Sequence, residues 1–349
     1  MYKYINSDLL MRKIIVNLQL LIIFFLICLG LGYAVLNRFD PASLVSMNDT
    51  AFYAAIVMNG IDGVSADFPD RILVPYLAHL VFLIIPKIGS WNMVNFALLI
   101  VNSFFTSISA MLILQMSYKI TNRMEYSILS CMFFLLNFHV INFYLVSSID
   151  SAYGFSLLLL IYSLYSQKFY YLPFLAILGC MIKEVFLPVG SGFILGWLFY
   201  EIYKYKSIEI NKVILFISFM LIGVITILLS DLVVNSGNNT FLYWSEHTQS
   251  LNSQEIHLNF SEILIGIVKF FFTLGWILVL AIPSLKDLPS SLVFSSFFAC
   301  IITIILGYAA GVQGSDYARF IYIPGAFIFS LGCSMSIFKM VNNLLNKID

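Results

Sequence analysis

The sequence predicts an all-α polytopic membrane protein in which residues 1–349 form a single transmembrane domain. Of its 349 residues, 61% are hydrophobic and only 10% are charged, whereas soluble domains average about 25% charged residues. The hydrophobic residues gather in runs close to the ~20 residues that a helix needs to cross a bilayer. The formal net charge is zero, so no overall field points to nucleic acid as a partner.

Ten apolar runs are expected to cross the membrane, giving about 10 transmembrane helices. They are 14–36, 92–117, 126–147, 152–167, 171–188, 190–203, 213–235, 262–283, 291–309 and 320–339. The first run is too long for a signal peptide and lacks a small-residue cleavage site, so we expect it to remain as a span. All five cysteines lie in apolar runs and are expected to be small core residues, not disulfide partners.

An eleventh apolar run, ILVPYLAHLVFLIIP at 72–86, is too short to cross easily, and the basic residues decide its placement. Cytoplasmic loops collect Lys and Arg. If the run does not cross, twelve basic residues lie inside: Lys3, Arg12, Lys13, Lys119, Arg123, Lys168, Lys204, Lys206, Lys212, Lys286, Lys339 and Lys347. If it crosses, the later segments invert and only six remain inside: Lys3, Arg12, Lys13, Lys87, Lys183 and Arg319. We therefore expect a re-entrant or interfacial helix at 72–86 and cytoplasmic termini.

This topology leaves few segments on the outer face. They are the first outer loop at 37–91 with its interfacial helices, the second outer loop at 236–261, the turns at 146–151 and 311–319, and the corner at Lys183. Any chemistry on that face must be built from these segments.

Lys183 and Glu184 interrupt the apolar stretch MIKEVFLPVG. Ionisable residues inside a membrane segment are costly and mark functional sites by default. On a helix that enters near Tyr171, Lys183 lies ~18 Å along the axis, in the outer part of the bilayer. Pro188 and the glycines after it predict a turn of the chain there. The alternative is a lysine that snorkels to the interface beside a glutamate at a helix end.

The first outer loop is the richest in polar residues. Asn48-Asp49-Thr50 predicts a helix start, and Tyr53 belongs to the amphipathic turn that follows. Asp70 and Arg71 directly precede the run at 72–86. For Asp49, Asp70 and Arg71 the structural alternative is a set of helix caps and an interfacial ion pair.

Three further positions carry charge near the outer side. Arg319 closes the turn at 311–319, and the alternative to a functional role is an anchor at the membrane interface. Asp150 lies in a tight turn, and its alternative role is to cap the next helix. Lys269 lies within its span, and an ion pair with Asp231, at similar depth, is its alternative.

The pattern of these charges matters more than any one of them. Arg71, Lys183, Arg319 and the deeper Lys269 place positive charge toward the outer face, against the usual bias. Cations there suit a phosphate or pyrophosphate at headgroup depth, and a carboxylate beside them suits a general base. The carboxylates at this level are Asp49, Asp70, Asp150 and Glu184. The combination indicates an enzyme that acts on a lipid-linked phosphate substrate.

The layout resembles the GT-C superfamily of integral membrane glycosyltransferases, which use polyprenyl-phosphate-linked sugars. The likeness rests on NDTAFY with Asp49, PDRILVPYL with Arg71 and Pro75, MIKEVFLP with Lys183, and DYARFIYIPG with Arg319. It covers most of the chain by layout. Each motif is short, and their order and shared membrane side give the combination its specificity.

The resemblance implies an inverting sugar transfer on the outer face. Asp49 would be the general base for an acceptor hydroxyl, and Arg71, Lys183 and Arg319 would stabilise the departing polyprenyl phosphate. The run at 72–86 would shape the donor's groove. Supporting roles fall to Tyr53, Asp70, Asp150, Glu184 and Lys269. The partners are then a lipid-linked sugar donor, a glycan or lipid acceptor and membrane lipids, with no cofactor and no nucleic acid.

The sequence departs from the family pattern in two ways. Asn48 precedes Asp49 where familiar members often carry an acidic pair, and there is no large outer domain. A glycan or lipid acceptor is therefore expected before a protein acceptor. Glu246, His247, Glu255 and His257 match no standard metal-ligand spacing, so no metal site is expected. The Phe-, Ile- and Asn-rich usage suits an AT-rich bacterial genome, which places the chain in a bacterial inner membrane.

Other functions remain open at this point. An O-antigen-type polymerase or ligase also carries outer arginines, but the loop 236–261 contains no Lys or Arg. A lipid-linked sugar transporter or flippase would place charges near the midplane and show inverted repeats, and none is visible. The break near Pro188 still allows a discontinuous helix of the transporter type. A non-catalytic membrane scaffold is the remaining alternative.

Overall fold

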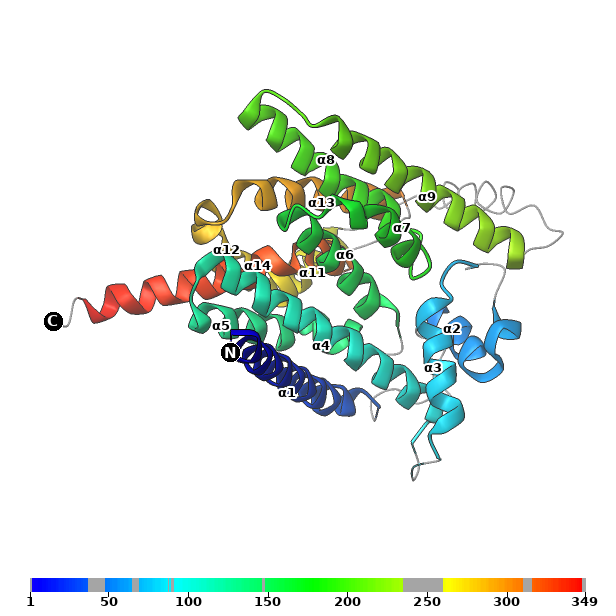
Figure 1. Ribbon diagram of the computed structural model, residues 1–349. Helices are drawn as coiled ribbons and strands as arrows, with labels where there is room; N and C mark the ends of the chain where they lie inside the picture. Colours follow the sequence, from blue (N-terminus) through cyan, green and yellow to red (C-terminus); the bar gives the residue numbers. More distant parts are fainter. Residues whose placement is uncertain are drawn as a thin grey trace.

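A computed structural model describes residues 2–36, 48–64, 69–86, 88, 91–145, 148–234, 260–309 and 316–346. These residues form helices and short connections, with no strand in the ranges given (Figure 1). Seven helical segments in this described part are long and apolar enough to cross a membrane, which fits an integral membrane protein. They lie in α1 (Tyr2–Leu36), α4 (Met93–Thr121), α8 (Phe186–Tyr205), α9 (Ile210–Val234), the stretch from α11 (Phe260–Phe270) to α12 (Trp276–Ala281), α13 (Ser290–Ala309) and α14 (Asp316–Leu345).

The expected count of about 10 spans is not confirmed, because three of the ten apolar runs form shorter helices. These are α5 (Met124–Leu135), α6 (Asp150–Tyr165) and α7 (Leu172–Cys180). The run at 126–147 is divided into α5 and a π-helical segment, η3 (Val140–Tyr144). Between them, the Asn137 side chain accepts a hydrogen bond from the His139 backbone N–H at 2.8 Å. Such a local bond competes with the helical ladder, which accounts for the interruption.

The eleventh run forms the helix α3 (Leu73–Ile84), which at 1.5 Å per residue is ~18 Å long and too short to cross a bilayer. It packs beside α2 (Asn48–Asn59). The imidazole of His79 lies 2.9 Å from the carbonyl oxygen of Val57. The chain leaves α2 through Gly60, whose φ of +66° favours glycine. The contact between His79 and Val57 fixes the position of α2 on α3.

The chain reverses direction at Met181–Val185, between α7 and α8. The sequence placed this turn at Pro188–Gly192, and that prediction was wrong. Pro188 is the third residue of α8, within the first turn, where a missing backbone N–H leaves no hydrogen bond unmade. Gln167, just before α7, and Tyr205, at the end of α8, line one common pocket. The two helices therefore form a hairpin with its turn at Lys183.

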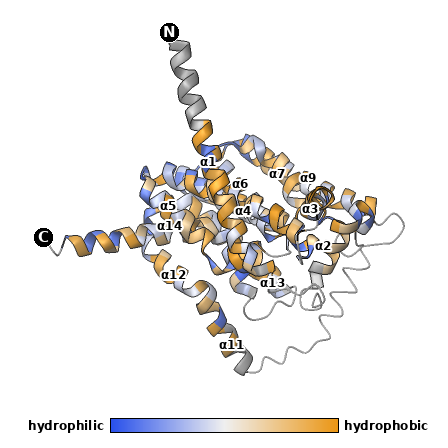
Figure 2. Ribbon diagram, turned by 90° about the horizontal axis from the view of Figure 1, so that it is seen from below, coloured by the Kyte–Doolittle hydropathy of each residue, from blue (hydrophilic) through white to orange (hydrophobic). Residues whose placement is uncertain are grey.

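Helix α8 packs very closely against α13 (Figure 1). A Cβ atom on Gly192 would lie 3.1 Å from the Ala299 Cα atom, and one on Gly196 would lie 2.7 Å from the Ser295 Cα atom. Small residues are the usual means by which membrane helices approach this closely. By contrast, α11 extends away from the rest of the bundle, as Figure 2 shows.

The hairpin and its neighbours define two ends of the bundle. At one end lie the turn at Lys183, the start of α6 and the start of α14. At the other end lie the ends of α4, α6 and α8 and the start of α13, which line one pocket. The basic residues at or near this second set of helix ends are Lys119, Arg123, Lys168, Lys204, Lys206, Lys212, Lys286 and Lys339. We refer to this second end as the basic end.

Candidate functional site

Arg71 and Glu184 form a two-pronged ion pair although they are 113 residues apart. The Arg71 Nε atom donates to Glu184 Oε2 at 3.0 Å, and Nη2 donates to Oε1 at 2.5 Å. The Nη1 atom donates to the Tyr53 hydroxyl at 3.3 Å. A planar guanidinium matches a carboxylate in this geometry, so α2, α3 and the hairpin turn are joined at one point.

Lys183, unlike its neighbour Glu184, does not face Arg71. It pairs with Asp150, the first residue of α6. Its Nζ atom lies 3.2 Å from Asp150 Oδ1, and also 5.4 Å from the ring centre of Tyr153. The Arg319 Nε atom at the start of α14 lies 3.7 Å from Asp150 Oδ2. Asp150 is buried, so its single carboxylate holds two cations from different helices together.

The hairpin turn is what brings these two ion pairs side by side. Lys183 and Glu184 are adjacent in sequence but lie in an irregular turn, and they face different partners. The Leu73 backbone N–H donates to the Met181 carbonyl oxygen at 3.2 Å, which attaches α3 to the turn. We refer to Arg71, Glu184, Lys183, Asp150 and Arg319, with Asp70, as the charged cluster.

Asp70 adds a third carboxyl group. It is buried, and burial together with the neighbouring Glu184 carboxylate raises the pKa of Asp70 to about 7. When Asp70 carries a proton, the cluster holds three cations against two carboxylates and has a net charge of +1. A buried site with excess positive charge favours an anion.

Arg319 is the cation of the cluster with the longest ion-pair distance, 3.7 Å. Its side chain is 25% exposed, and its Nε atom makes no hydrogen bond within the described residues. The guanidinium lies 5.0 Å from the Phe143 ring centre and 5.1 Å from that of Phe320. An arginine held by rings and by one long ion pair keeps donors free for a further acceptor.

The sequence did not single out the aromatic residues that support Arg319. Phe143 belongs to the π-helical segment η3, and π-helical turns often occur at functional sites. His139 is buried and stacks between Phe143 and Tyr322, with centroid distances of 5.7 and 5.1 Å. The available signal was His139, the one histidine in the run at 126–147.

Two of the predicted site residues are not part of the observed cluster. Asp49 lies in α2, one helical turn before Tyr53, but its side chain is outside the described residues. Lys269 is exposed on α11, which extends away from the bundle (Figure 2). The residues Glu246, His247, Glu255 and His257, and most of the loop at 236–261, lie outside the described part of the chain. Within that part there is no group of three residues suited to hold a metal.

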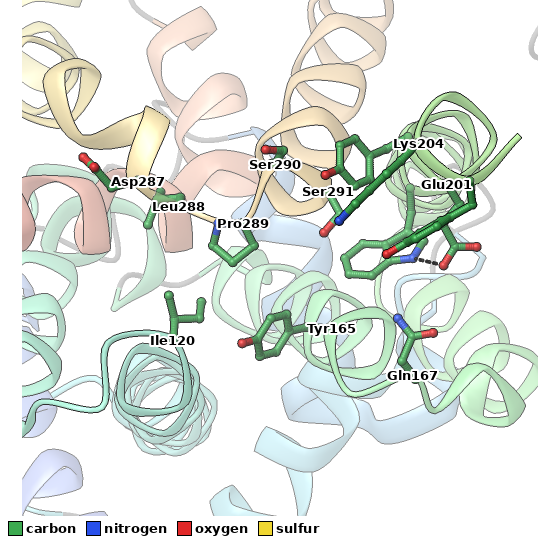
Figure 3. Close-up of a pocket in the computed structure, with 13 residues that line it drawn as sticks. Ile120, Tyr165, Gln167, Glu201, Lys204, Asp287, Leu288, Pro289, Ser290 and Ser291 are labelled. Carbon is green, nitrogen blue, oxygen red and sulfur yellow. Dashed lines mark hydrogen bonds between the residues drawn. The ribbon is translucent and has the colours of Figure 1, made fainter.

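A cavity lies far from the cluster, at the basic end. It has a volume of about 530 Å³ and lies between the ends of α4, α6 and α8 and the start of α13 (Figure 3). Asp150 begins α6 and Tyr165 ends it, so the cluster and this cavity lie at opposite ends of one helix. No protein-family model matches this chain, and no curated protein matches it either.

Proposed function

We propose that this chain is an integral membrane glycosyltransferase that moves a sugar from a polyprenyl-phosphate donor to a glycan or lipid acceptor. The observation that carries the proposal is the charged cluster. Three cations that were selected from the sequence, Arg71, Lys183 and Arg319, come from three separate segments and meet at one end of the bundle.

The charge balance supports a phosphate ligand. Below about pH 7, where the protonated form of Asp70 is favoured, the cluster carries one excess positive charge, which a phosphate diester would neutralise. Arg319 is partly exposed and only loosely paired, so it can take a phosphate oxygen without breaking the Arg71–Glu184 pair. Fixed cations at this place would stabilise the charge that develops on the leaving phosphate.

The reaction is a single displacement at the anomeric carbon. An acceptor hydroxyl oxygen forms the new glycosidic bond as the bond between carbon and phosphate oxygen breaks, and the polyprenyl phosphate leaves with the electron pair. Asp49 takes the hydroxyl proton. Arg71 and Tyr53 hold α2 against α3, and Asp49 is one helical turn from that contact.

The distribution of charge supports a position of the cluster on the outer face of the membrane. The opposite end carries eight basic residues, Lys119, Arg123, Lys168, Lys204, Lys206, Lys212, Lys286 and Lys339, and so fits the cytoplasmic side. The break beside Lys183 is a hairpin turn at one end of the bundle. It therefore counts against a transporter, whose discontinuous helices and charges would lie near the midplane.

The test compares variants in a strain from which the gene has been deleted, at matched expression. Wild type is expected to restore a lipid-linked intermediate or surface glycan that is larger by one sugar, as measured by mass spectrometry. Asp49→Asn is expected to abolish it, and Arg319→Lys to reduce the initial rate by a factor of about 100, because the loss of a fixed donor to developing charge has that size.

Two matched controls complete this test. Asp62→Asn removes an exposed carboxylate from the same outer loop, and Arg123→Lys changes an exposed arginine at the basic end. Both are expected to behave as wild type. If Asp49→Asn restores the same glycan, Asp49 is not the base. If deletion of the gene alters no glycan or lipid-linked sugar, the glycosyltransferase proposal is rejected.

A further inference from the structure

The cavity at the basic end has walls of mixed chemistry. Tyr165 from α6 and Tyr200 from α8 contribute aromatic rings. Ser290 and Ser291 at the start of α13 contribute hydroxyl groups (Figure 3). Its volume of about 530 Å³ is in the range of pockets that hold small molecules. The charge of the ligand that it suits follows from its ionisable residues.

The two carboxylates that line the cavity are already neutralised by lysines from outside it. Glu201 is buried, and its oxygens accept hydrogen bonds from Lys212 Nζ at 2.9 and 3.0 Å and from the Trp197 ring N–H at 3.1 Å. Asp287 pairs with Lys339 of α14. Lys212 also lies 3.4 Å from the exposed Glu209, so it serves two carboxylates, and each carboxylate that lines the cavity still has a lysine partner.

Lys204 is the lining residue whose charge is not balanced. In the described part of the chain no carboxylate lies within ion-pair distance of it, and its Nζ atom lies 5.1 Å from the Tyr205 ring centre and 5.8 Å from that of Tyr200. In Figure 3 it lies on the same side of the cavity as Ser290 and Ser291. An exposed ammonium that has tyrosine neighbours but, among the described residues, no carboxylate partner, beside hydroxyl donors, is the chemistry that binds a phosphate oxygen.

We propose that this cavity binds a phosphate group, carried by the headgroup of a membrane lipid or by a soluble phosphate ester. Lys204 supplies the ion pair, and Ser290 and Ser291 supply hydrogen bonds. The positive end of α13 adds to the attraction, and the tyrosine rings cover the group attached to the phosphate. This site is separate from the charged cluster, so it stands or falls independently of the proposed glycosyltransferase activity.

The test uses full-length protein that has been purified in detergent and stripped of lipid. Two probes separate the sources of phosphate: dioctanoyl phosphatidylglycerol as the lipid and glycerol 3-phosphate as the soluble ester. Dioctanoylglycerol, which lacks phosphate, controls for the lipid chains. Binding is measured by native mass spectrometry for wild type, Lys204→Gln and Lys286→Gln. Lys286 is exposed and close to the cavity in sequence but does not line it.

Lys204→Gln is expected to weaken binding of a phosphate probe roughly tenfold or more, as expected for the loss of a charged hydrogen bond, while Lys286→Gln leaves it unchanged. Binding of phosphatidylglycerol alone would assign the site to a lipid, and binding of both probes would assign it to the phosphate group itself. Equal weakening by the two variants would show that binding depends on the overall positive charge of the basic end and not on Lys204. This result would overturn the proposal. Failure of both probes to bind, or equal binding of dioctanoylglycerol, would also overturn it.

Discussion

At the scale of single residues, the charged cluster shows what a sequence can and cannot specify. Lys183 and Glu184 were selected because they interrupt an apolar run, and Asp150, Arg71 and Arg319 because they lie in the turns and loop expected on the outer face. Their partners could not be read from the sequence. Glu184 pairs with a residue 113 positions away, and such a pairing depends on how the helices pack.

The Arg71–Glu184 pair gives the first prediction. Glu184→Gln is expected to destabilise the protein by about 3–5 kcal/mol, because it leaves the buried guanidinium without a counter-charge. The double variant Arg71→Met with Glu184→Met is expected to recover most of that loss, since both charges are gone. Thermal unfolding of the purified protein measures both effects. If the double variant is no more stable than Glu184→Gln, the ion pair is not the source of the loss.

Asp70 gives a prediction of pH dependence. The pKa of Asp70 is raised in the folded protein to about 7, whereas an aspartate in an unfolded chain has a pKa near ~3.9. Between these values the folded state keeps a proton that the unfolded state releases, so stability falls as pH rises from about 4 to about 7.

Asp70→Asn mimics the protonated form and is expected to remove this part of the pH dependence. The variant should unfold at a higher temperature than wild type at about pH 8, and the difference should shrink toward about pH 5. The exposed Asp62→Asn serves as the control. A constant difference between Asp70→Asn and wild type at all pH values would show that Asp70 does not titrate in this range.

At the scale of helices, the sequence located the apolar segments but not their boundaries. The turn at Met181–Val185 was predicted too late because Pro188 was treated as a breaker, although proline is tolerated in the first turn of a helix. The run at 126–147 was taken as one span, although Asn137, His139 and Asn142 lie within it. Only the side-chain bond of Asn137 to the backbone reveals where it divides.

The contact between α8 and α13 gives a prediction at this scale. A Cβ on Gly196 would lie 2.7 Å from the Ser295 Cα atom and 2.9 Å from the Phe294 carbonyl oxygen. Since these are backbone atoms, Gly196→Ala is expected to force the helices apart and cost about 1–3 kcal/mol. Gly30→Ala, where the new atom would meet nothing within 4 Å, should be neutral or stabilising. Equal melting temperatures for the two variants would contradict the close approach.

At the scale of the whole molecule, the proposed orientation in the membrane rests on where the basic residues lie. Helix ends that are far apart in the sequence share the basic end, and the sequence count of basic residues had already put them on the cytoplasmic side. The number of spans was less predictable. A run of apolar residues does not say whether its helix is long enough to cross alone, as α5, α6 and α7 demonstrate.

Orientation gives the last prediction. Asp62→Cys and Ser207→Cys change exposed residues at opposite ends of the bundle, while the native cysteines are buried or half-buried. A membrane-impermeant maleimide is expected to label Asp62→Cys in intact cells and Ser207→Cys only after the membrane is opened. The reverse pattern would place the charged cluster on the cytoplasmic side.

The unequal arms of the α7–α8 hairpin have a consequence for the lipid around them. The arm from Phe169 to Cys180 is ~18 Å long, whereas α8 is ~30 Å long, which is the thickness of the hydrocarbon layer. Phe174 and Ile177 on the short arm are exposed and apolar. We therefore expect lipid chains to pack against this short surface and the layer to thin there. Headgroups would then descend toward the turn at Lys183. If the proposed sugar transfer uses a lipid donor that enters here, its rate is expected to rise in vesicles of shorter acyl chains.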